Sequence, residues 1–86
     1  MIKWERGEPV WESDRAVWKQ IADELRGRIE AGTYPPRKAI PSLTALVQEF
    51  GVARNTIRKV ISRLSEEGLL RTEMGVGTFV VPRDDR

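Results

Sequence analysis

The side chains best suited to chemistry in this sequence are basic, and they gather in one short segment. Between Gly51 and Ser65 every charged residue is a cation, although fifteen Lys and Arg against thirteen Asp and Glu give the whole chain a net charge of only +2; these cations are Arg54, Arg58, Lys59 and Arg63. Guanidinium and ammonium groups concentrated in this way bind phosphate, and an arginine can also pair with the O6 and N7 atoms of guanine. The segment therefore predicts an anionic partner, with nucleic acid as the first candidate.

Catalytic and metal chemistry have little support. The chain has no cysteine and no histidine, which excludes disulfides, zinc fingers, iron–sulfur clusters and nearly every nucleophile–histidine arrangement. We assign no catalytic residue, metal site or cofactor, expect no enzyme, and find no evident small-molecule site. No stretch approaches the roughly 18 apolar residues of a membrane span, and no signal peptide is legible, so we expect no membrane partner and a cytoplasmic protein.

The basic segment is predicted to form a helix from Ala53 to Glu67. Its apolar residues recur at the i, i+3, i+4, i+7 spacing of a buried stripe, and they are Ile57, Val60, Ile61 and Leu64. The opposite side carries Asn55, Arg58, Lys59 and Ser62. A DNA recognition helix needs one face that packs on its domain and one polar, basic face.

Two further helices are expected ahead of it. Ser42 is a good N-cap for a helix over 43–50, and Gly51 can adopt the left-handed conformation that ends it. Val52 and Ala53 then complete a turn of helix-turn-helix length. The first helix is expected to start after a cap at Ser13 or Asp14 and to run to about residue 31. A proline-rich connector follows, in which Ile40 can form a very short strand.

A glycine-rich hairpin is expected after the basic helix, with Gly75 and Gly77 at its tip. The predicted fold is α+β, mainly α: a winged helix-turn-helix with three helices and a small antiparallel hairpin, the wing. Residues 1–14 are expected to be an extended N-terminal arm on which Trp11, and Trp4 with it, dock onto the domain. The winged helix domain would span 15–81, and 82–86 would be a flexible tail.

From about Ala16 to Val81 the chain resembles the amino-terminal domain of the GntR family of bacterial transcriptional regulators. The matching blocks, in order, are VWKQIADELRGRIEAG, YPPRKAIPS, EFGVARNTIRKVISRLSEEGLL and GVGTFV. The resemblance implies a winged helix that binds double-stranded DNA as a homodimer on a palindromic operator, most often to repress, at the bacterial nucleoid. In that family a larger carboxy-terminal domain usually binds a small molecule, so this is either a small stand-alone regulator or the DNA-binding part of a longer one.

The chain departs from the family pattern at three places. Arg37 stands where the connector usually has glycine, and Leu43-Thr44-Ala45 replaces a common Glu-Arg-Glu stretch. The arginine of that stretch contacts DNA in the family, so Thr44 implies a weaker or absent contact. Ala53 replaces the serine that usually caps the recognition helix, which costs about 1 kcal/mol if nothing compensates. These changes bear on the operator sequence more than on the fold.

The first candidates for DNA contact lie at the start of the basic helix. Arg54 is placed to bond a guanine and would supply ~1–3 kcal/mol of discrimination; its alternative is a solvated surface arginine. Asn55 can bond adenine or merely assist the turn. Thr56 and Arg58 match family positions that hold DNA, chiefly through phosphate.

The remaining candidates surround this helix. Lys59 and Arg71 serve phosphate or plain solubility. Ser42 and Thr44 can present hydroxyl and N–H groups to a phosphate, or act only as cap and surface. In the wing, over 74–78, we expect Gly75, Gly77 and Thr78 to meet the DNA backbone or minor groove, the alternative being that the glycines serve only the turn.

Two other functions stay open. A winged helix that has lost DNA binding could be a protein-interaction module, although apolar residues would then be expected on the faces that carry Arg54 and Arg58. A nonspecific architectural DNA-binding protein would usually carry more charge. The salt dependence of binding to random duplex and to a selected palindrome distinguishes these possibilities.

Overall fold

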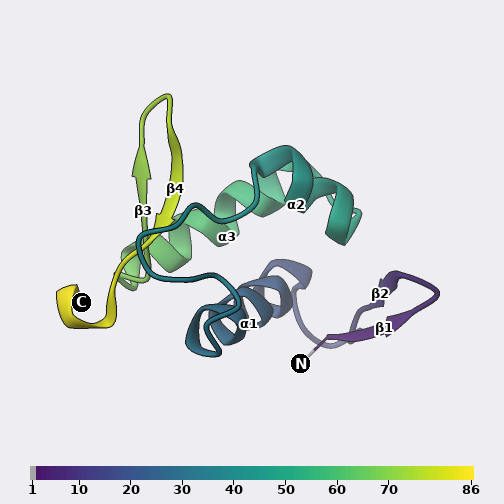
Figure 1. The fold of residues 1–86 in the computed structure, drawn as a ribbon. Coiled ribbons are helices and arrows are strands. Elements are labelled where there is room, and N and C mark those ends of the chain that lie inside the picture. The colour runs from purple at the N-terminus through teal and green to yellow at the C-terminus, as the bar shows by residue number, and fades with distance from the viewer. Residues whose placement is uncertain (1) are drawn as a thin grey trace.

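The computed structural model describes residues 2–86 and is a winged helix, as predicted (Figure 1). The elements in chain order are β1 (Lys3–Glu5), β2 (Glu8–Val10), α1 (Val17–Glu30), α2 (Leu43–Phe50), α3 (Arg54–Glu66), β3 (Leu70–Glu73), β4 (Gly77–Val80) and a short 3-10 helix (Arg83–Asp85). Within the described residues, β1 pairs with β2 and β3 with β4, each pair antiparallel. No helix in this part of the chain is long and apolar enough to span a bilayer.

The core lies where α1, α2 and α3 meet, and it fixes the orientation of α3. The stripe predicted on α3 is buried at Ile57, Val60 and Leu64, each fully excluded from solvent, while Ile61 is only partly buried. These side chains pack with a matching stripe of α1 and with α2, through Ile21, Leu25, Ile29, Leu46 and Phe50. Because this side of α3 is committed to the core, its polar side must face water.

The helix-turn-helix forms as its sequence predicts. The Ser42 hydroxyl accepts a 3.1 Å hydrogen bond from the Ala45 N–H, and Gly51 ends α2 with φ 65°. Ala53 holds the N-cap position of α3 in an extended conformation and makes no side-chain capping bond. The predicted loss of a capping interaction at Ala53 is therefore confirmed.

The predicted start of α1 is wrong. Neither Ser13 nor Asp14 caps the helix, which begins at Val17 after Ala16, without a side-chain cap. The reason is the buried side chain of Gln20, whose amide bonds the backbone of Glu12 in both directions at 2.9 Å and also donates to the Arg15 carbonyl at 3.0 Å. These bonds hold residues 12–15 outside the helix.

The N-terminal arm, expected to be extended, forms a two-stranded hairpin. Arg6 and Gly7 have φ of 54° and 79°, the positive values that a tight two-residue hairpin turn requires. Docking of both tryptophans is confirmed, because the rings of Trp4 and Trp11 lie 5.7 and 6.4 Å from the ring of Phe50. The hairpin thus packs on the last residue of α2.

The tail also has defined structure, which corrects the expectation for residues 82–86. The 3-10 turn brings the guanidinium groups of Arg83 and Arg86 to the carboxylate of Glu30, at 2.8 and 3.2 Å. Both pairs join the end of the chain to the last residue of α1.

The wing is fixed at its base by the proline-rich connector. Ala39 bridges to Phe79, and the Ile40 N–H donates to the Thr78 carbonyl at 2.9 Å, so the short strand expected at Ile40 is a single bridge one residue earlier. Arg37 has φ 66° while its N–H donates to the Val80 carbonyl at 2.8 Å. A positive φ costs a residue other than glycine about 1–2 kcal/mol, which fits the glycine that the resemblance implies at this position. In Figure 1 the wing rises away from the helices.

Candidate nucleic-acid interface

The polar face of α3 carries free positive charge. Arg54, Asn55, Arg58 and Lys59 are exposed, and Thr56 is half-buried beside them. Among residues 2–86 no carboxylate forms an ion pair with Arg54, Arg58 or Lys59, whereas Arg63, one turn beyond them, pairs with Glu67 at 3.2 Å. The first half of α3 is therefore available to an external anion, and Arg63 is not.

Two hydrogen bonds order the start of this face. The Arg54 guanidinium donates to the Thr44 hydroxyl at 3.2 Å, which connects the first turns of α3 and α2. The Arg58 guanidinium lies 3.4 Å from the Asn55 side-chain oxygen, a long contact within one turn of helix. Thr44, which the family comparison marked as a lost contact, thus holds Arg54 in place.

Trp18 lies at the edge of this surface while also packing against the core. Its ring is half-buried, and the Lys59 ammonium lies 4.6 Å above the ring centre. The two side chains line a hollow of about 390 Å³ with Val17, Asn55 and Thr56. The sequence held one signal for this position of Trp18. The buried stripe of α1 follows Ile21, Leu25 and Ile29 at four-residue spacing, and Trp18 lies one residue off that stripe.

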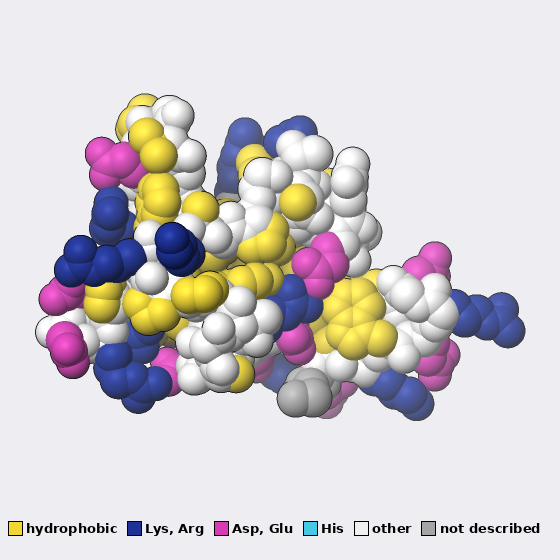
Figure 2. Space-filling model, viewed as in Figure 1, with side chains coloured by type: hydrophobic (Ala, Val, Ile, Leu, Met, Phe, Trp, Pro, Cys, Tyr) yellow, Lys and Arg dark blue, Asp and Glu magenta, His cyan; other side chains and the backbone are white. Residues whose placement is uncertain are grey.

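The start of α2 and the wing lie next to each other. Ser42, Leu43, Ile61 and residues 72–78 line one hollow of about 520 Å³. The side-chain oxygen of Ser42 already accepts the hydrogen bond that caps α2. The hydroxyl oxygens of Thr72 and Thr78 lie 3.5 Å apart. Figure 2 shows Lys and Arg side chains at the upper edge of the molecule beside the wing.

The wing itself has a different character. The Arg71 guanidinium pairs with Glu73 at 2.9 Å and lies 5.2 Å from the centre of the Phe79 ring, so its charge is partly compensated. Gly75, at the tip, has φ 74°, and a Cβ there would meet nothing within 4 Å. At Gly77, with φ 154°, a Cβ would lie 3.8 Å from that of Ala39. A side chain at Gly75 would thus be opposed by its backbone conformation rather than by its neighbours.

Half-buried or bidentate ion pairs fix the helices that present this surface. Arg28, on α1, donates to Glu49 of α2 at 2.6 Å, to Tyr34 at 2.7 Å and to Glu24 at 2.9 Å. Burial alone would lower the pKa of Arg28, but these hydrogen bonds raise it above its usual value. The Tyr34 pKa is raised, first by burial.

A second set of ion pairs joins α1 to α3. The Arg26 guanidinium donates hydrogen bonds to both carboxylate oxygens of Glu67, at 2.8 and 2.7 Å, and to Asp23 at 2.7 Å. Asp23 also accepts a 2.6 Å hydrogen bond from Arg15. The hydrogen bond from Arg26 lowers the pKa of Glu67, and the bond from Arg15 lowers that of Asp23. The axis of α3 is thereby held against α1 at its carboxyl end.

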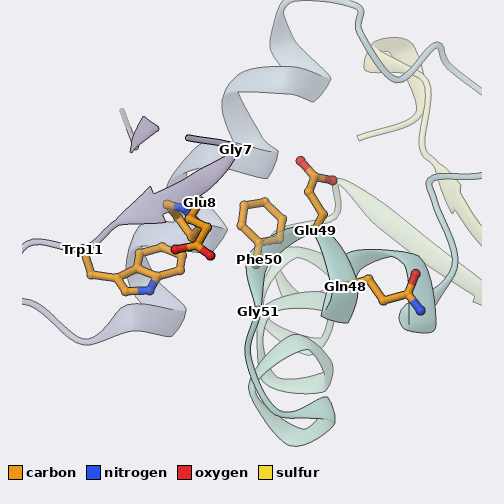
Figure 3. Close-up of a pocket in the computed structure, with 8 residues that line it drawn as sticks. Gly7, Glu8, Trp11, Gln48, Glu49, Phe50 and Gly51 are labelled. Carbon is orange, nitrogen blue, oxygen red and sulfur yellow. The ribbon is translucent and has the colours of Figure 1, made fainter. Parts of the chain in front are cut away.

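A hollow on the opposite flank does not suit an anion. It measures about 380 Å³ and lies between the N-terminal hairpin and the end of α2, where Trp11 and Phe50 form its apolar wall (Figure 3). Its ionisable lining consists of Glu8 and Glu49. Among the described residues the lining contains no Lys or Arg, so this hollow is not part of the basic surface.

One face of α3 is a buried apolar stripe and the other is a free basic face. A tight turn joins α3 to the capped helix α2, and the β3–β4 hairpin flanks them. This arrangement is that of a winged helix-turn-helix DNA-binding domain. Residues 18–80 match the model of the family described as bacterial regulatory proteins, gntR family. The chain belongs to this family, and the resemblance inferred from the sequence is confirmed.

Named relatives and solved structures agree with this assignment. The chain is 45% identical over 69 residues to an uncharacterized HTH-type transcriptional regulator, RB1450, of Rhizobium meliloti, covering 80% of this chain and 28% of that protein. It is 39% identical over 66 residues to the mannosyl-D-glycerate transport/metabolism system repressor MngR of Escherichia coli, covering 77% and 28%. The chain thus spans just over a quarter of the length of these relatives.

Two solved structures extend the comparison to three dimensions. The AraR DNA-binding domain in complex with operator ORX1 superimposes with a TM-score of 0.76 at 35% identity, covering 84% of this chain and 93% of that one. YtrA from Sulfolobus acidocaldarius, a GntR-family transcription factor, gives a TM-score of 0.75 at 29% identity, covering 84% and 76%.

Proposed function

We propose that this chain is the sequence-specific DNA-binding unit of a bacterial transcriptional regulator, acting most simply as a repressor at the nucleoid in the cytoplasm. The observation that carries the proposal is the first half of α3, where Arg54, Arg58 and Lys59 are exposed and, within residues 2–86, form no ion pair with a carboxylate. AraR, similar in fold over nearly all of its DNA-binding domain, is held on an operator in its crystal structure, which supports the same class of partner here.

The roles on α3 follow from position and chemistry. Arg54, at the first position of the helix, is aimed at a base edge, and a guanine offers it two acceptors. Asn55 is exposed beside it and suits adenine N6 and N7. Thr56 and Arg58 hold phosphates, and Lys59 adds charge from the rim of the Trp18 hollow.

The surrounding contacts are with the DNA backbone and, at the wing, with the backbone or the minor groove. Thr44 contributes by holding Arg54, and the exposed first turn of α2, capped by Ser42, offers N–H groups to a phosphate. In the wing, Gly75, Gly77 and Thr78 allow a close approach of main chain to DNA, and Arg71 flanks them.

Two copies are proposed to bind one site. A single winged helix offers one major-groove helix, and a chain of 86 residues has little surface with which to reach nanomolar affinity alone. A two-fold symmetric operator of two half-sites supplies the missing contact area.

The test is selection of duplex DNA from a random library by the whole chain, followed by titration of the selected duplex and of random duplex over a range of salt. We expect a palindromic consensus, two chains per duplex by sedimentation, and at least about a thousandfold preference over random DNA. Equal affinity for both duplexes would indicate an architectural DNA-binding protein, and no binding to either would indicate a protein-interaction module.

A further inference from the structure

The tip of the wing carries apolar side chains that are largely exposed to water. Met74 is 91% exposed and Val76 is 70% exposed, whereas Val10, the next most exposed large apolar residue among residues 2–86, reaches 41%. Figure 2 shows hydrophobic side chains reaching the upper end of the wing. Apolar groups held in water in this way usually mark a contact surface.

The same tip lacks positive charge. Between Thr72 and Thr78 the single charged residue is Glu73, and its carboxylate is paired with Arg71 at 2.9 Å. An electrostatic contact with phosphate would depend on backbone N–H groups alone, because no cation lies between Thr72 and Thr78 and Arg71 is already paired with Glu73. What the tip offers a partner is therefore mainly apolar surface.

The backbone holds these side chains away from the domain. The turn is closed by a 3.0 Å hydrogen bond from the Val76 N–H to the Glu73 carbonyl, and the wing base is bonded to the connector through Ile40 and Thr78. Met74 and Val76 lie at the edge of the 520 Å³ hollow toward α2 without filling it, as their exposure shows. Both line the same hollow as Ser42 and Leu43 at the start of α2.

We propose that Met74 and Val76 enter the minor groove of the operator, outside the segment read by α3, and place apolar surface against its base pairs. The proposal depends on the DNA-binding function proposed above and deepens it. Apolar side chains in the minor groove partly unstack a base step, and pyrimidine–purine steps such as TpA deform most easily. The wing thus selects a deformable flanking step rather than a hydrogen-bond pattern.

Duplex DNA suits this tip better than a protein does. A stable protein interface needs about 800 Å² from each partner, and two side chains on a narrow hairpin supply only a small part of that. The tip is also continuous, through the hollow lined by Ser42 and Ile61, with the start of α2 and with α3. One duplex lying along α3 can therefore meet the wing without a second partner.

The test uses the whole chain and a duplex that it selects from a random library, with the flanking step under the wing either TpA or GpC. Met74→Ser and Val76→Ser are compared with Val10→Ser, a matched change at an exposed valine of the N-terminal hairpin. We expect each wing variant to weaken binding to the TpA duplex by about tenfold, the order expected for one covered apolar side chain. The salt dependence and melting temperature stay unchanged. Preference for TpA over GpC falls, and energy transfer between end labels shows less DNA bending. Val10→Ser changes none of these.

Three results would overturn the proposal. Unchanged affinity of Met74→Ser would remove the apolar contact. Tighter binding and a steeper salt dependence with Met74→Lys would place the tip on phosphates. A dimer of the free chain that Met74→Ser converts to monomer would assign the tip to a second copy.

Arg58→Ala separates this inference from the function on which it depends. If Arg58→Ala weakens DNA binding while both wing variants bind as tightly as the parent chain, only the proposed minor-groove contact is refuted. If Arg58→Ala and the wing variants are all silent, or the chain selects no duplex, the proposed DNA-binding function fails with it.

Discussion

The guanidinium of Arg54 donates a 3.2 Å hydrogen bond to the hydroxyl of Thr44, so the first residue of α3 is held by the first turn of α2. The bond restricts a long side chain before any ligand arrives, which lowers the entropy lost when that side chain binds. Thr44 therefore acts on the DNA contact through Arg54, and the two positions should be altered together as well as separately.

Arg54→Ala is expected to weaken binding to the selected operator by about 1–3 kcal/mol, because a base-edge contact is lost. Binding to random duplex should fall much less. Thr44→Val removes only the holding hydroxyl and should give a smaller loss in the same direction, none of which remains in the Arg54→Ala background. Titration of all four proteins measures this, and equal losses on random and selected DNA would contradict base reading by Arg54.

Arg58→Ala is expected to weaken binding to every duplex to a similar extent. A phosphate contact carries no sequence information, and its loss lowers the slope of log affinity against log salt by about one. Titrations at several salt concentrations measure the slope. Arg63→Ala is the control, because Arg63 is paired with Glu67 and should leave the slope nearly unchanged. A large loss of discrimination with an unaltered slope would assign Arg58 to a base instead.

Gly75→Val is expected to reduce operator affinity more than tenfold while the melting temperature of the free chain falls by only a few degrees. The β-branched residue resists the φ of 74° and lifts the tip, but it meets no neighbour within 4 Å. Thermal unfolding and DNA titration must be measured separately. Loss of folding without a specific loss of affinity would limit the glycine to a role in the turn.

Trp11→Ala is expected to destabilise the fold by about 2 kcal/mol, less than a fully buried tryptophan, because Trp11 is only partly buried. The loss follows from the contact with the Phe50 ring at 6.4 Å. Denaturant unfolding measures it. Arg6→Ala at the exposed hairpin turn, with φ of 54°, is the comparison within the same segment. A variant as stable as the parent would show that the hairpin does not support α2.

Stability is expected to fall in acid because the pKa values of two carboxyl groups are lowered in the folded protein. These groups are Asp23, whose ordinary pKa is 3.8, and Glu67, whose ordinary pKa is 4.5. A carboxylate whose folded-state pKa is lowered stabilises the fold above its unfolded pKa, and that stability is lost as pH falls through the folded value. Both side chains are partly exposed, so each pair contributes less than about 1 kcal/mol. In urea unfolding, the free energy of unfolding of Arg26→Met should depend less steeply on pH below about pH 5 than that of the parent chain. Lys3→Met, which removes the exposed pair with Glu5, should leave this pH dependence unchanged.

The sequence predicted the parts of this fold that depend on local signals. The bounds of α2 follow from Ser42 as cap and Gly51 as terminator, and α3 follows from the spacing of Ile57, Val60 and Leu64. The start of α1 could not be read locally, because Gln20 binds backbone eight residues away. The hairpin turn was equally hidden, since arginine rarely adopts the positive φ seen at Arg6.

The same division applies to the interface. The basic face of α3 is legible from residue types and period, whereas the pairing of Arg71 with Glu73 and of Arg54 with Thr44 depends on side-chain placement. Trp18 shows the limit most clearly. Its place beside the apolar stripe of α1 can be seen in the sequence, but only the packing of α1 against α3 brings its ring next to Lys59.

The positions of the three tryptophans give the protein two intrinsic optical reporters. Trp4 and Trp11 lie on Phe50 at the N-terminal hairpin, and Trp18 lies beneath Lys59 at the edge of the basic face. Movement of the Lys59 ammonium toward a phosphate would change the electric field at the Trp18 indole and leave the surroundings of Trp4 and Trp11 unchanged. Emission from single-tryptophan variants can therefore follow ligand arrival at α3 and hairpin detachment independently, without an added dye.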